Sequence, residues 1–407
     1  MNTAVLPPGR TASTASSNST SRHIGAVFGA ALLGAVAWSG VPGLLALSCL
    51  APFVIVSASS RGKVALRAGA YFLGATWPIV PAAAVFFGEE SVGSGSVVLG
   101  VAFWLLVSAL NVLPWVLVAP MRARGRAIGV VIGLALAAMP PLALVGLASP
   151  LAGLGWWLPG TGGWGIALYA VAGVLFVTCD RVSMLRGVLA FSALAVLGSY
   201  GVLAKPPHTT NIWQAVSTPA SIGTGERAAQ AMEQLRRSAS TSTARVVVLP
   251  ETLFNQWTAS NEAFLRPLWR ELAARNQVVL FGVQRLDSAT GLIDNLVLIR
   301  GRESGEYAQH LPVPISMYRL GEAGSVPVRW RGPYTATIFG ERVGLLICWE
   351  QLLVAPMLFL ALESPDRLVG LSNLYFARGT PVAAIQEAAL QSWARLYGVP
   401  WIHAVYE

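Results

Sequence analysis

The sequence has little charge, little cysteine and little histidine, and each shortage disfavours a class of protein. Only 12% of its 407 residues are charged, whereas soluble domains carry about 25%, so much of the chain is not expected to face water. One cysteine, Cys348, lies in the carboxyl-terminal half, so an intradomain disulfide is excluded there. Four scattered histidines disfavour a histidine-rich metal site.

Apolar residues make up 54% of the chain and gather in long runs between Ile24 and Leu203. A membrane-spanning helix needs about 20 such residues. We predict seven spans, at 24–40, 43–58, 68–88, 95–119, 127–148, 163–179 and 187–203. The first two predicted spans are short. An alternative interpretation is that they form one re-entrant pair and do not cross the membrane separately. A cleaved signal peptide is disfavoured because a polar tail precedes the first run.

Arginine and lysine occur in alternate loops between these runs. They lie within 61–67, 122–126 and 181–186 and in the amino-terminal tail, whereas the intervening loops carry two glutamates or no charge. This positive-inside pattern predicts a cytoplasmic tail at 1–23, a transmembrane domain at 24–204 and a periplasmic domain at 205–407 of a bacterial inner-membrane protein. The net charge of +9 reflects this pattern in part, so we do not expect a nucleic-acid partner.

From Lys205 onward the charge density is ordinary and helices alternate with strands. The segment 206–226 is interpreted as a linker or a first strand. We predict helices at 225–240, 261–276 and 381–397 and strands at 245–251, 277–284, 293–300, 334–339, 343–348 and 400–406. This alternation predicts a layered α/β domain.

Polar residues of the types used in catalysis follow three apolar strands in this domain. Glu251 follows VVVLP, Cys348 follows VGLLI, and Asn373 lies in LSNLYF. We expect them to converge on one edge of a sheet. A carboxylate that takes the proton of a thiol, with amide donors for an oxyanion, suits acyl transfer through a thioester. Each residue alone also has a structural explanation, as a core cysteine, a helix-terminal carboxylate or a turn residue.

The segments VVVLPET, LLICWE and LSNLYF, in this order and spacing, resemble the signature segments of the carbon–nitrogen hydrolase (nitrilase) superfamily. With a multi-span membrane domain in front, the layout is similar to the apolipoprotein N-acyltransferase branch, and more similar still to conjugal-transfer TraB proteins. The resemblance implies an α-helical polytopic membrane domain followed by a nitrilase-like α-β-β-α sandwich. That family usually continues beyond a strand such as 400–407, so we expect either a truncated chain or a sandwich that lacks a strand.

The resemblance also assigns roles to individual residues. It implies that Glu251 is the general base and Cys348 the nucleophile of a Glu–Lys–Cys triad. Glu350 matches the carboxylate that follows the nucleophile. Trp349, Asn373 and Tyr375 are the residues expected to contact substrate.

The triad lysine is where the sequence departs from the family. Gln309 occupies its position, and the two lysines of the chain, Lys63 and Lys205, lie elsewhere. A charged donor forms a hydrogen bond about twice as strong as a neutral one, and loss of one oxyanion donor costs about 10²–10³ in rate. His310 and Arg319 are alternative sources of charge. A proline-stiffened loop without a catalytic role is the competing interpretation.

Two classes of function stay open. One is a Cys-dependent acyltransferase or amidase, with membrane phospholipid as an acyl donor and a lipoprotein, envelope or conjugation protein as partner. The resemblance implies no cofactor and no metal. The other is a catalytically degenerate nitrilase-fold scaffold in a conjugal-transfer or envelope assembly, which the missing lysine favours. A transporter is disfavoured because the predicted spans carry no charged residue.

Overall fold

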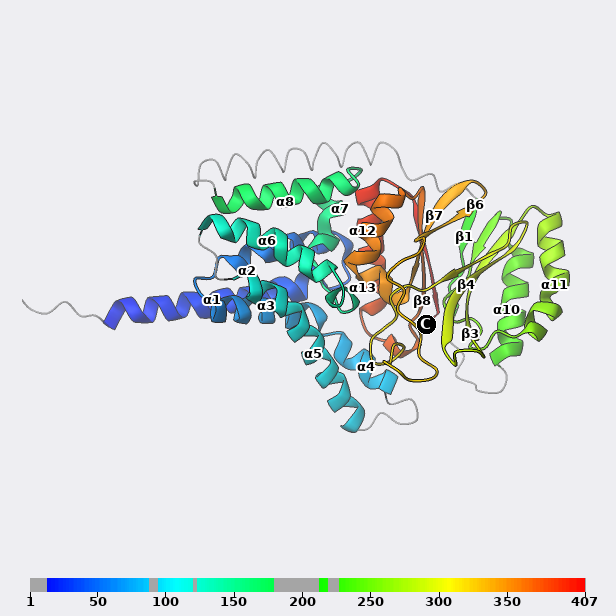
Figure 1. Ribbon diagram of the computed structural model, residues 1–407, viewed down its shortest axis with the longest axis horizontal. Helices are drawn as coiled ribbons and strands as arrows, with labels where there is room; N and C mark the ends of the chain where they lie inside the picture. Colours follow the sequence, from blue (N-terminus) through cyan, green and yellow to red (C-terminus); the bar gives the residue numbers. More distant parts are fainter. Residues whose placement is uncertain (1–12, 88–93, 120–122, 179–211, 219–226, 407) are drawn as a thin grey trace, which may run out of the picture.

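The computed structural model describes residues 13–87, 94–119, 123–178, 212–218 and 227–406. A helical region occupies one end of the molecule and an α/β region the other (Figure 1). The α-helices of the first region are α1 (Ser13–Ala37), α2 (Ala51–Val56), α3 (Arg61–Thr76), α4 (Ile79–Phe87), α5 (Ser94–Val118), α6 (Ala123–Ala138), α7 (Leu154–Trp157) and α8 (Gly163–Thr178). Short 3-10 helices are η1 (Pro42–Leu50), η2 (Leu142–Leu144) and η3 (Pro150–Gly153).

The seven predicted membrane spans are not confirmed. Among the described residues, one helix, Gly95–Val118, is long and apolar enough to cross a membrane. Helices α3 and α4 meet the same criterion only as a pair that is bent by 56°. The seventh predicted span, 187–203, and the predicted domain boundary at 204 lie outside the described residues.

Prolines explain why several apolar runs are not single helices. Pro42 directly precedes the second run and Pro52 lies within it, and this run forms a 3-10 helix followed by the short α2. The third run breaks between α3 and α4, next to Pro78. Proline lacks an N–H and clashes with the preceding turn, so it interrupts or bends a helix. The start of the chain also differs from expectation, because α1 begins at Ser13, inside the predicted polar tail.

The α/β region contains two sheets. The first consists of β1 (Trp213–Ala215), β2 (Val246–Val248), β3 (Val278–Leu286), β4 (Ile293–Gly301) and β5 (Gly305–Ala308), in that order. Its first three strands are parallel, and the remaining pairs are antiparallel. The second consists of β6 (Thr335–Ile338), β7 (Glu341–Ile347), β8 (Arg367–Asn373) and β9 (Trp401–Tyr406). Here only the β6–β7 pair is antiparallel.

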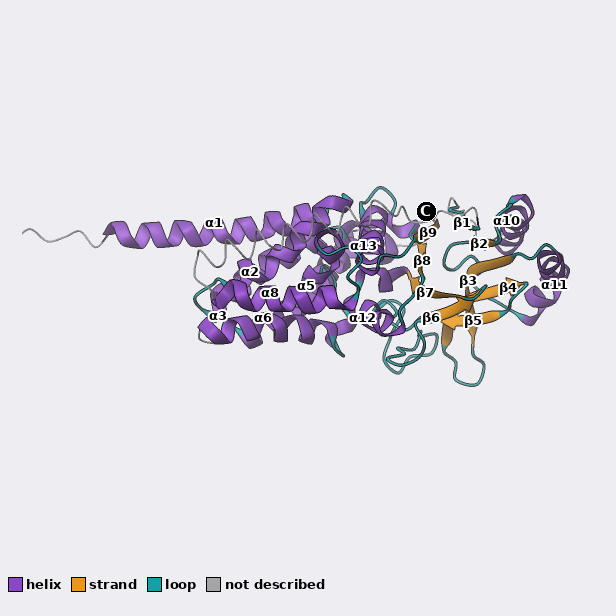
Figure 2. Ribbon diagram, turned by 90° about the horizontal axis from the view of Figure 1, so that it is seen from above, coloured by secondary structure: helices purple, strands orange, loops and turns teal. Residues whose placement is uncertain are grey.

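Helices cover the outer face of each sheet, so the region is an α-β-β-α sandwich (Figure 2). Helices α10 (Arg227–Thr241) and α11 (Ala259–Ala274) pack on the first sheet, and α12 (Val354–Glu363) and α13 (Val382–Tyr397) pack on the second. The side chains of β3 alternate accordingly: Val279 and Phe281 face the helices, whereas Val278 and Leu280 face the other sheet. The predicted sandwich is therefore present, although β5 and α12 were not predicted.

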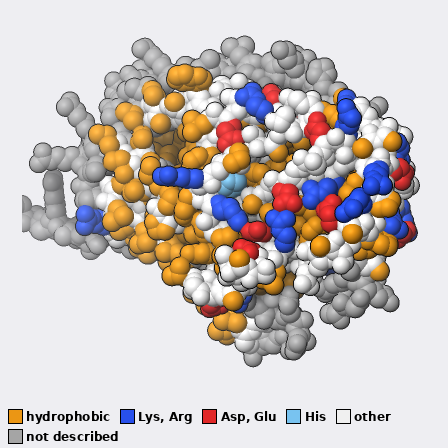
Figure 3. All heavy atoms as spheres, turned by 45° about the vertical axis from the view of Figure 1, so that its right-hand side comes forward, with side chains coloured by type: hydrophobic (Ala, Val, Ile, Leu, Met, Phe, Trp, Pro, Cys, Tyr) orange, Lys and Arg blue, Asp and Glu red, His pale blue; other side chains and the backbone are white. Residues whose placement is uncertain are grey.

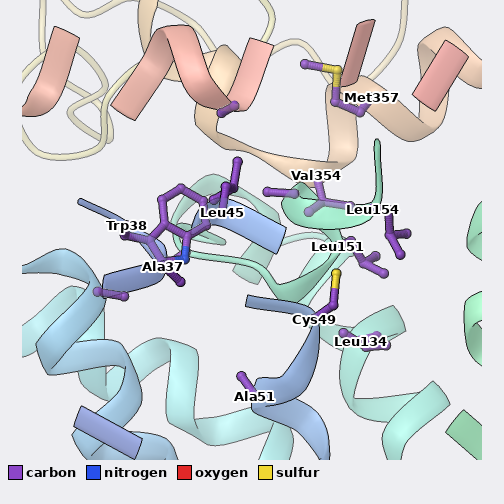
Figure 4. Packing of buried hydrophobic residues seen from close by; sticks show 14 of the residues in the cluster. Ala37, Trp38, Leu45, Cys49, Ala51, Leu134, Leu151, Leu154, Val354 and Met357 are labelled. Atoms are coloured by element: carbon purple, nitrogen blue, oxygen red, sulfur yellow. The ribbon is translucent and has the colours of Figure 1, made fainter. Parts of the chain in front are cut away.

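The helical region packs against the α12–α13 side of the sandwich. Trp38, Leu45 and Leu154 share one buried cluster with Val354 and Met357 of α12 (Figure 4). Helix α7 approaches α13 so closely that a Cβ at residue 155 would lie 1.6 Å from the Ser392 carbonyl oxygen, which explains a glycine there. The two regions therefore share one hydrophobic core in addition to the sandwich interior.

Candidate active site

Cys348 lies at the carboxyl end of β7, where the strand turns into the 3-10 helix η4 (Cys348–Leu352). Its φ angle is +50°, a conformation that costs free energy for any residue other than glycine. Such strain concentrates at functional sites because surrounding packing holds it in place. The side chain is 6% exposed and lines a cavity. The turn therefore presents a buried thiol to that cavity.

Glu251 follows β2 and lies on the opposite sheet. Asn295 Nδ2 donates to its Oε1 atom at 2.8 Å, and the backbone N–H of Asn373 donates to Oε2 at 2.9 Å. The carboxylate also lies close to the Cys348 thiol, and each group shifts the pKa of the other. A Cβ at Gly282 would lie 2.4 Å from the Glu251 Cα atom, so a side chain at 282 would displace this carboxylate. The three strand-end residues predicted from the sequence thus meet in space.

Burial raises the pKa of the Cys348 thiol well above its usual value, and the adjacent Glu251 charge raises it further. The Asn373 backbone and the Gln386 side chain oppose this shift by hydrogen bonding. Burial also raises the pKa of Glu251, although its hydrogen bonds to Asn295, Cys348 and Asn373 lower it. At neutral pH the resting sulfur is therefore a thiol. Its reaction with a carbonyl needs a base, and Glu251 is in place to act as one.

Glu350 is fully buried but does not line the cavity. Its Oε2 atom accepts from the Ile347 N–H at 2.8 Å, and Oε1 accepts from the His310 and Leu311 N–H groups at 2.7 and 3.0 Å. Burial raises the pKa of Glu350 to about 7, while the three donors lower it. This carboxylate therefore ties the nucleophile turn to the 310–311 segment and does not face the cavity.

Gln309 is also fully buried and lies behind the reacting pair. Its Oε1 atom accepts from Asn295 Nδ2 at 2.9 Å, and its Nε2 atom donates to the Ile347 carbonyl at 3.2 Å. It is absent from the cavity lining. Gln309 is thus linked to Glu251 only through Asn295, and its amide is bonded to protein groups and is not presented as an oxyanion donor.

The two alternative sources of charge do not reach the thiol. His310 stacks on Tyr334 with 4.1 Å between ring centroids, and Arg319 pairs with Glu322 at 3.3 Å. Neither residue lines the cavity. The described partners of Glu251 are all neutral groups.

The cavity has a volume of about 1670 Å³ and two kinds of wall. The sandwich contributes the reacting pair and polar side chains, whereas α3, α4 and α5 contribute apolar ones such as Ala82, Phe86 and Phe103. Among the described residues of its lining, only Glu251 and Arg378 are charged. A large cavity with a mostly apolar surface and polar side chains beside the candidate reacting groups is the usual form of a ligand site.

The three predicted substrate-contacting residues all line this cavity. The indole N–H of Trp349 donates to the Leu144 carbonyl at 2.9 Å, which links the nucleophile turn to the helical region. Tyr375 packs edge-on against Phe376 at 5.7 Å. The Oδ1 atom of Asn373 is buried and has no hydrogen-bond partner among the described residues, so it is available to accept from a substrate N–H or O–H.

Sequence reasoning missed two buried polar residues that touch the reacting pair. Asn295 is fully buried on β4 and bridges Glu251 and Gln309. Gln386 is 2% exposed on α13, and its Nε2 atom lies 3.8 Å from Cys348 Sγ. A signal existed in both cases, because each amide interrupts an apolar face of its strand or helix, and buried amides need partners.

No protein-family model matches the chain. It is 26% identical over 403 residues to the conjugal transfer protein TraB of Agrobacterium fabrum, which covers 91% of this chain and 90% of that protein. It is 28% identical over 387 residues to the probable conjugal transfer protein TraB of Sinorhizobium fredii, which covers 91% of this chain and 95% of that protein.

Similar solved structures are enzymes of the nitrilase type. A carbon–nitrogen hydrolase from Helicobacter pylori shares 16% identity with a TM-score of 0.37, covering 47% of this chain and 73% of that one. An amidase of the nitrilase superfamily from Nesterenkonia shares 13% identity with a TM-score of 0.36, covering 47% of this chain and 74% of that one. The predicted resemblance to conjugal-transfer TraB proteins is confirmed by the two relatives, and the solved structures that are similar to the chain include a carbon–nitrogen hydrolase.

Proposed function

We propose that this chain is a membrane-bound, nitrilase-like protein of the conjugal-transfer type that transfers or hydrolyses an acyl or amide group through a thioester on Cys348. The observation that carries the proposal is that the Cys348 thiol and the Glu251 carboxylate lie together at the wall of one large cavity, close enough for the charge of Glu251 to raise the pKa of the thiol. A nucleophile, a base oriented by two donors and space for a substrate are what thioester chemistry requires.

The reaction runs in two balanced halves. Glu251 takes the proton of Cys348 Sγ while the sulfur attacks the donor carbonyl carbon, so a C–S bond forms and an oxyanion develops. As the oxyanion collapses, the bond to the leaving oxygen or nitrogen breaks and Glu251 returns the proton to that atom. An acceptor amine or water then attacks the thioester and gives its proton to Glu251. The C–S bond breaks, and the proton returns to Sγ.

Exposed apolar side chains support a membrane location for the helical region. On the face shown in Figure 3, hydrophobic side chains dominate the helical end, whereas charged side chains lie over the sandwich. Large hydrophobics that are more than half exposed include Phe28, Leu32, Val98, Leu117 and Trp164. Such extensive apolar exposure is unusual for a surface in water. With the arginine-rich loops inside, the proposal puts the helical region (24–204) in the inner membrane and the sandwich (205–407) in the periplasm.

The apolar wall of the cavity supports a lipid-derived donor. Ala82, Phe86 and Phe103 belong to α4 and α5, and they line the same cavity as Cys348. Because α5 is the described helix that is long enough to cross a bilayer, an acyl chain is able to pass from the membrane to the thiol along an apolar surface. We propose membrane phospholipid as the acyl donor and a lipoprotein, envelope or conjugation protein as the acceptor.

A non-catalytic scaffold is the second candidate, and one observation favours it. The carboxylate of Glu251 has only neutral described partners, since Asn295, Asn373 and the thiol occupy it and Gln309 stands where the family has its lysine. Without a cation, the oxyanion is stabilised less. In that case the sandwich serves as an interaction module in a conjugal-transfer or envelope assembly.

Mass spectrometry of the intact protein distinguishes the two candidates. After incubation with phospholipid vesicles, an enzyme gains the mass of one acyl chain, and hydroxylamine removes it. Cys348→Ala abolishes the adduct. Cys49→Ala serves as the matched control, because Cys49 is equally buried but lies outside the cavity lining, and it leaves the adduct in place. If wild-type protein never carries an adduct and Cys348→Ala still supports plasmid transfer, the scaffold function holds and the catalytic one is wrong.

A further inference from the structure

A buried chain of polar side chains leads from the second sheet to the reacting sulfur. Ser372 Oγ, on β8, donates to Gln386 Oε1 at 2.7 Å and lies 2.9 Å from His403 Nε2, on β9. Gln351 Nε2 donates to the same hydroxyl at 2.9 Å. Gln386 Nε2 points to Cys348 Sγ at 3.8 Å. Ser372 is fully buried and Gln386 is 2% exposed, so water does not compete for these bonds.

The donor and acceptor roles of these hydrogen-bonded side chains can be assigned in order, starting at the Cys348 sulfur. Gln386 faces the sulfur with its Nε2 amide group, at 3.8 Å from Cys348 Sγ, and an amide nitrogen can only donate a hydrogen bond. The Oε1 atom of Gln386 then faces Ser372 and can only accept, so the hydroxyl hydrogen goes there. The hydroxyl oxygen has two acceptor sites left, which Gln351 and His403 fill. His403 therefore carries its hydrogen on Nε2.

We propose that Gln386 is a further catalytic residue, which donates a hydrogen bond to the Cys348 thiolate, and that Ser372 and His403 are positioning residues that keep its N–H group aimed at the sulfur. The inference rests on the proposed thioester chemistry of Cys348. Its physical basis is that the neutral Gln309 stands where the resemblance implies a lysine, so a buried neutral donor supplies part of the stabilisation of the charged sulfur. Burial lowers the pKa of His403 to about 4, so near pH 7 its imidazole is neutral and its hydrogen bond to Ser372 does not change.

The pH profile of Cys348 alkylation tests this inference without any acyl donor. The full chain in detergent is treated with iodoacetamide over a pH series, and peptide mass spectrometry follows Cys348 separately from the other two cysteines. Gln386→Met keeps the length of the side chain but removes the donor. We expect its profile to move to higher pH, so that alkylation at a fixed pH below the midpoint is about tenfold slower, the lower end for a hydrogen bond to a charged group.

Further variants separate a donor from a structural role. Ser372→Ala, which frees Gln386 Oε1, is expected to shift the profile in the same direction by a smaller amount, and Ser372→Thr, which keeps the hydroxyl, is expected to restore it. Gln277→Met is the matched control, since Gln277 is a buried glutamine that bonds to the Ser242 and Ala244 carbonyls away from the cavity. The Gln277→Met variant also loses a buried amide, but it is expected to leave the pH profile of Cys348 alkylation unchanged.

The inference is overturned if Gln386→Met gives the same profile as wild type, or if the control Gln277→Met shifts the profile as much as Gln386→Met does. Should Gln386→Met fail to fold, the isosteric Gln386→Glu decides, because an acidic group beside the sulfur shifts the profile strongly to higher pH and an unchanged profile again refutes the role. Absence of an acyl adduct on wild-type protein would defeat the proposed function alone, since the alkylation profile still reports whether Gln386 stabilises the thiolate.

Discussion

Asn295 Nδ2 lies 2.8 Å from Glu251 Oε1, and the same nitrogen lies 2.9 Å from Gln309 Oε1. Both hydrogens of this amide are thereby used, and the orientation of Gln309 follows, because its oxygen must face Asn295. Its nitrogen then faces the Ile347 carbonyl. A neutral bridge thus joins Glu251 to the segment that bears Cys348, at the position where the sequence motifs predict a lysine.

Replacement of the base separates two effects of Glu251 on the thiol. Glu251→Gln removes the proton acceptor, so acyl-adduct formation is expected to fall by about 10²–10⁴-fold, the usual contribution of a general base. The same change removes the negative charge that raises the pKa of Cys348, so the midpoint of iodoacetamide alkylation is expected at lower pH. Both expectations are checked by measuring the rate of acyl-adduct formation and the pH profile of alkylation on the same Glu251→Gln protein. Unchanged adduct formation would reduce Glu251 to a structural residue.

Restoration of the lysine tests whether the site has lost only charge. Gln309→Lys is expected to raise the rate of acyl-adduct formation by up to about 10²-fold, on the scale of one oxyanion donor. Gln309→Met is the matched control, because it removes the bonds to Asn295 and Ile347 without adding a cation. Intact-mass kinetics compare the two variants. A lysine variant no faster than the methionine variant would show that position 309 does not reach the reacting atoms.

Glu350 is expected to act on stability. Glu350→Ala leaves the N–H groups of Ile347, His310 and Leu311 without their acceptor. Buried donors without partners cost about 1–3 kcal/mol each, so the free energy of unfolding is expected to fall by roughly 3 kcal/mol or more. Chemical denaturation measures this loss. Glu233→Ala, at an exposed ion pair with Arg237, is the control that changes stability little.

Acidic pH is expected to weaken the sandwich through His310. Burial, together with the nearby charge of Arg329, lowers the pKa of His310 to about 4, below the usual value of about 6.5. The unfolded chain therefore binds a proton between these values while the folded chain does not, and stability falls as the pH drops from 6.5 to 4. The size of this effect is on the order of 2–3 kcal/mol.

Thermal unfolding at pH 7 and pH 5 checks the role of His310. The aromatic variant His310→Phe keeps the stacking surface on Tyr334 and cannot titrate, so it is expected to lose less stability than wild type at pH 5. An equal loss in both proteins would assign the pH dependence to other groups. His403 is one such group, because burial lowers its pKa in the same direction.

Reporter fusions test the proposed topology. Fusions after residues 62, 124 and 183 are expected to report the cytoplasm, since basic residues surround these positions. Fusions after residues 92, 157 and 240 are expected to report the periplasm. Alkaline phosphatase and fluorescent-protein fusions provide opposite readouts at each position. A cytoplasmic signal after residue 240 would rule out a lipid acyltransferase at the outer face.

Local sequence determined the chemistry of the site and the layers around it. Glu251, Cys348 and Asn373 each follow an apolar strand, and the ends of neighbouring strands meet by the geometry of sheets, so their convergence was predictable. Alternating helices and strands likewise indicated the layered α/β domain. The short β5 escaped prediction, because four residues at a sheet edge carry little periodic signal.

Only the tertiary structure decided how these residues are connected. Asn295 and Gln386 reach the reacting pair from β4 and α13, far along the chain from Glu251 and Cys348. Their contacts depend on how two sheets and a helix pack, which no local pattern encodes. The same holds for the orientation of Gln309, which is set by hydrogen-bond partners on other strands. The apolar wall of the cavity is likewise a product of packing, because α4 and α5 reach Cys348 only when the helical region docks on the sandwich.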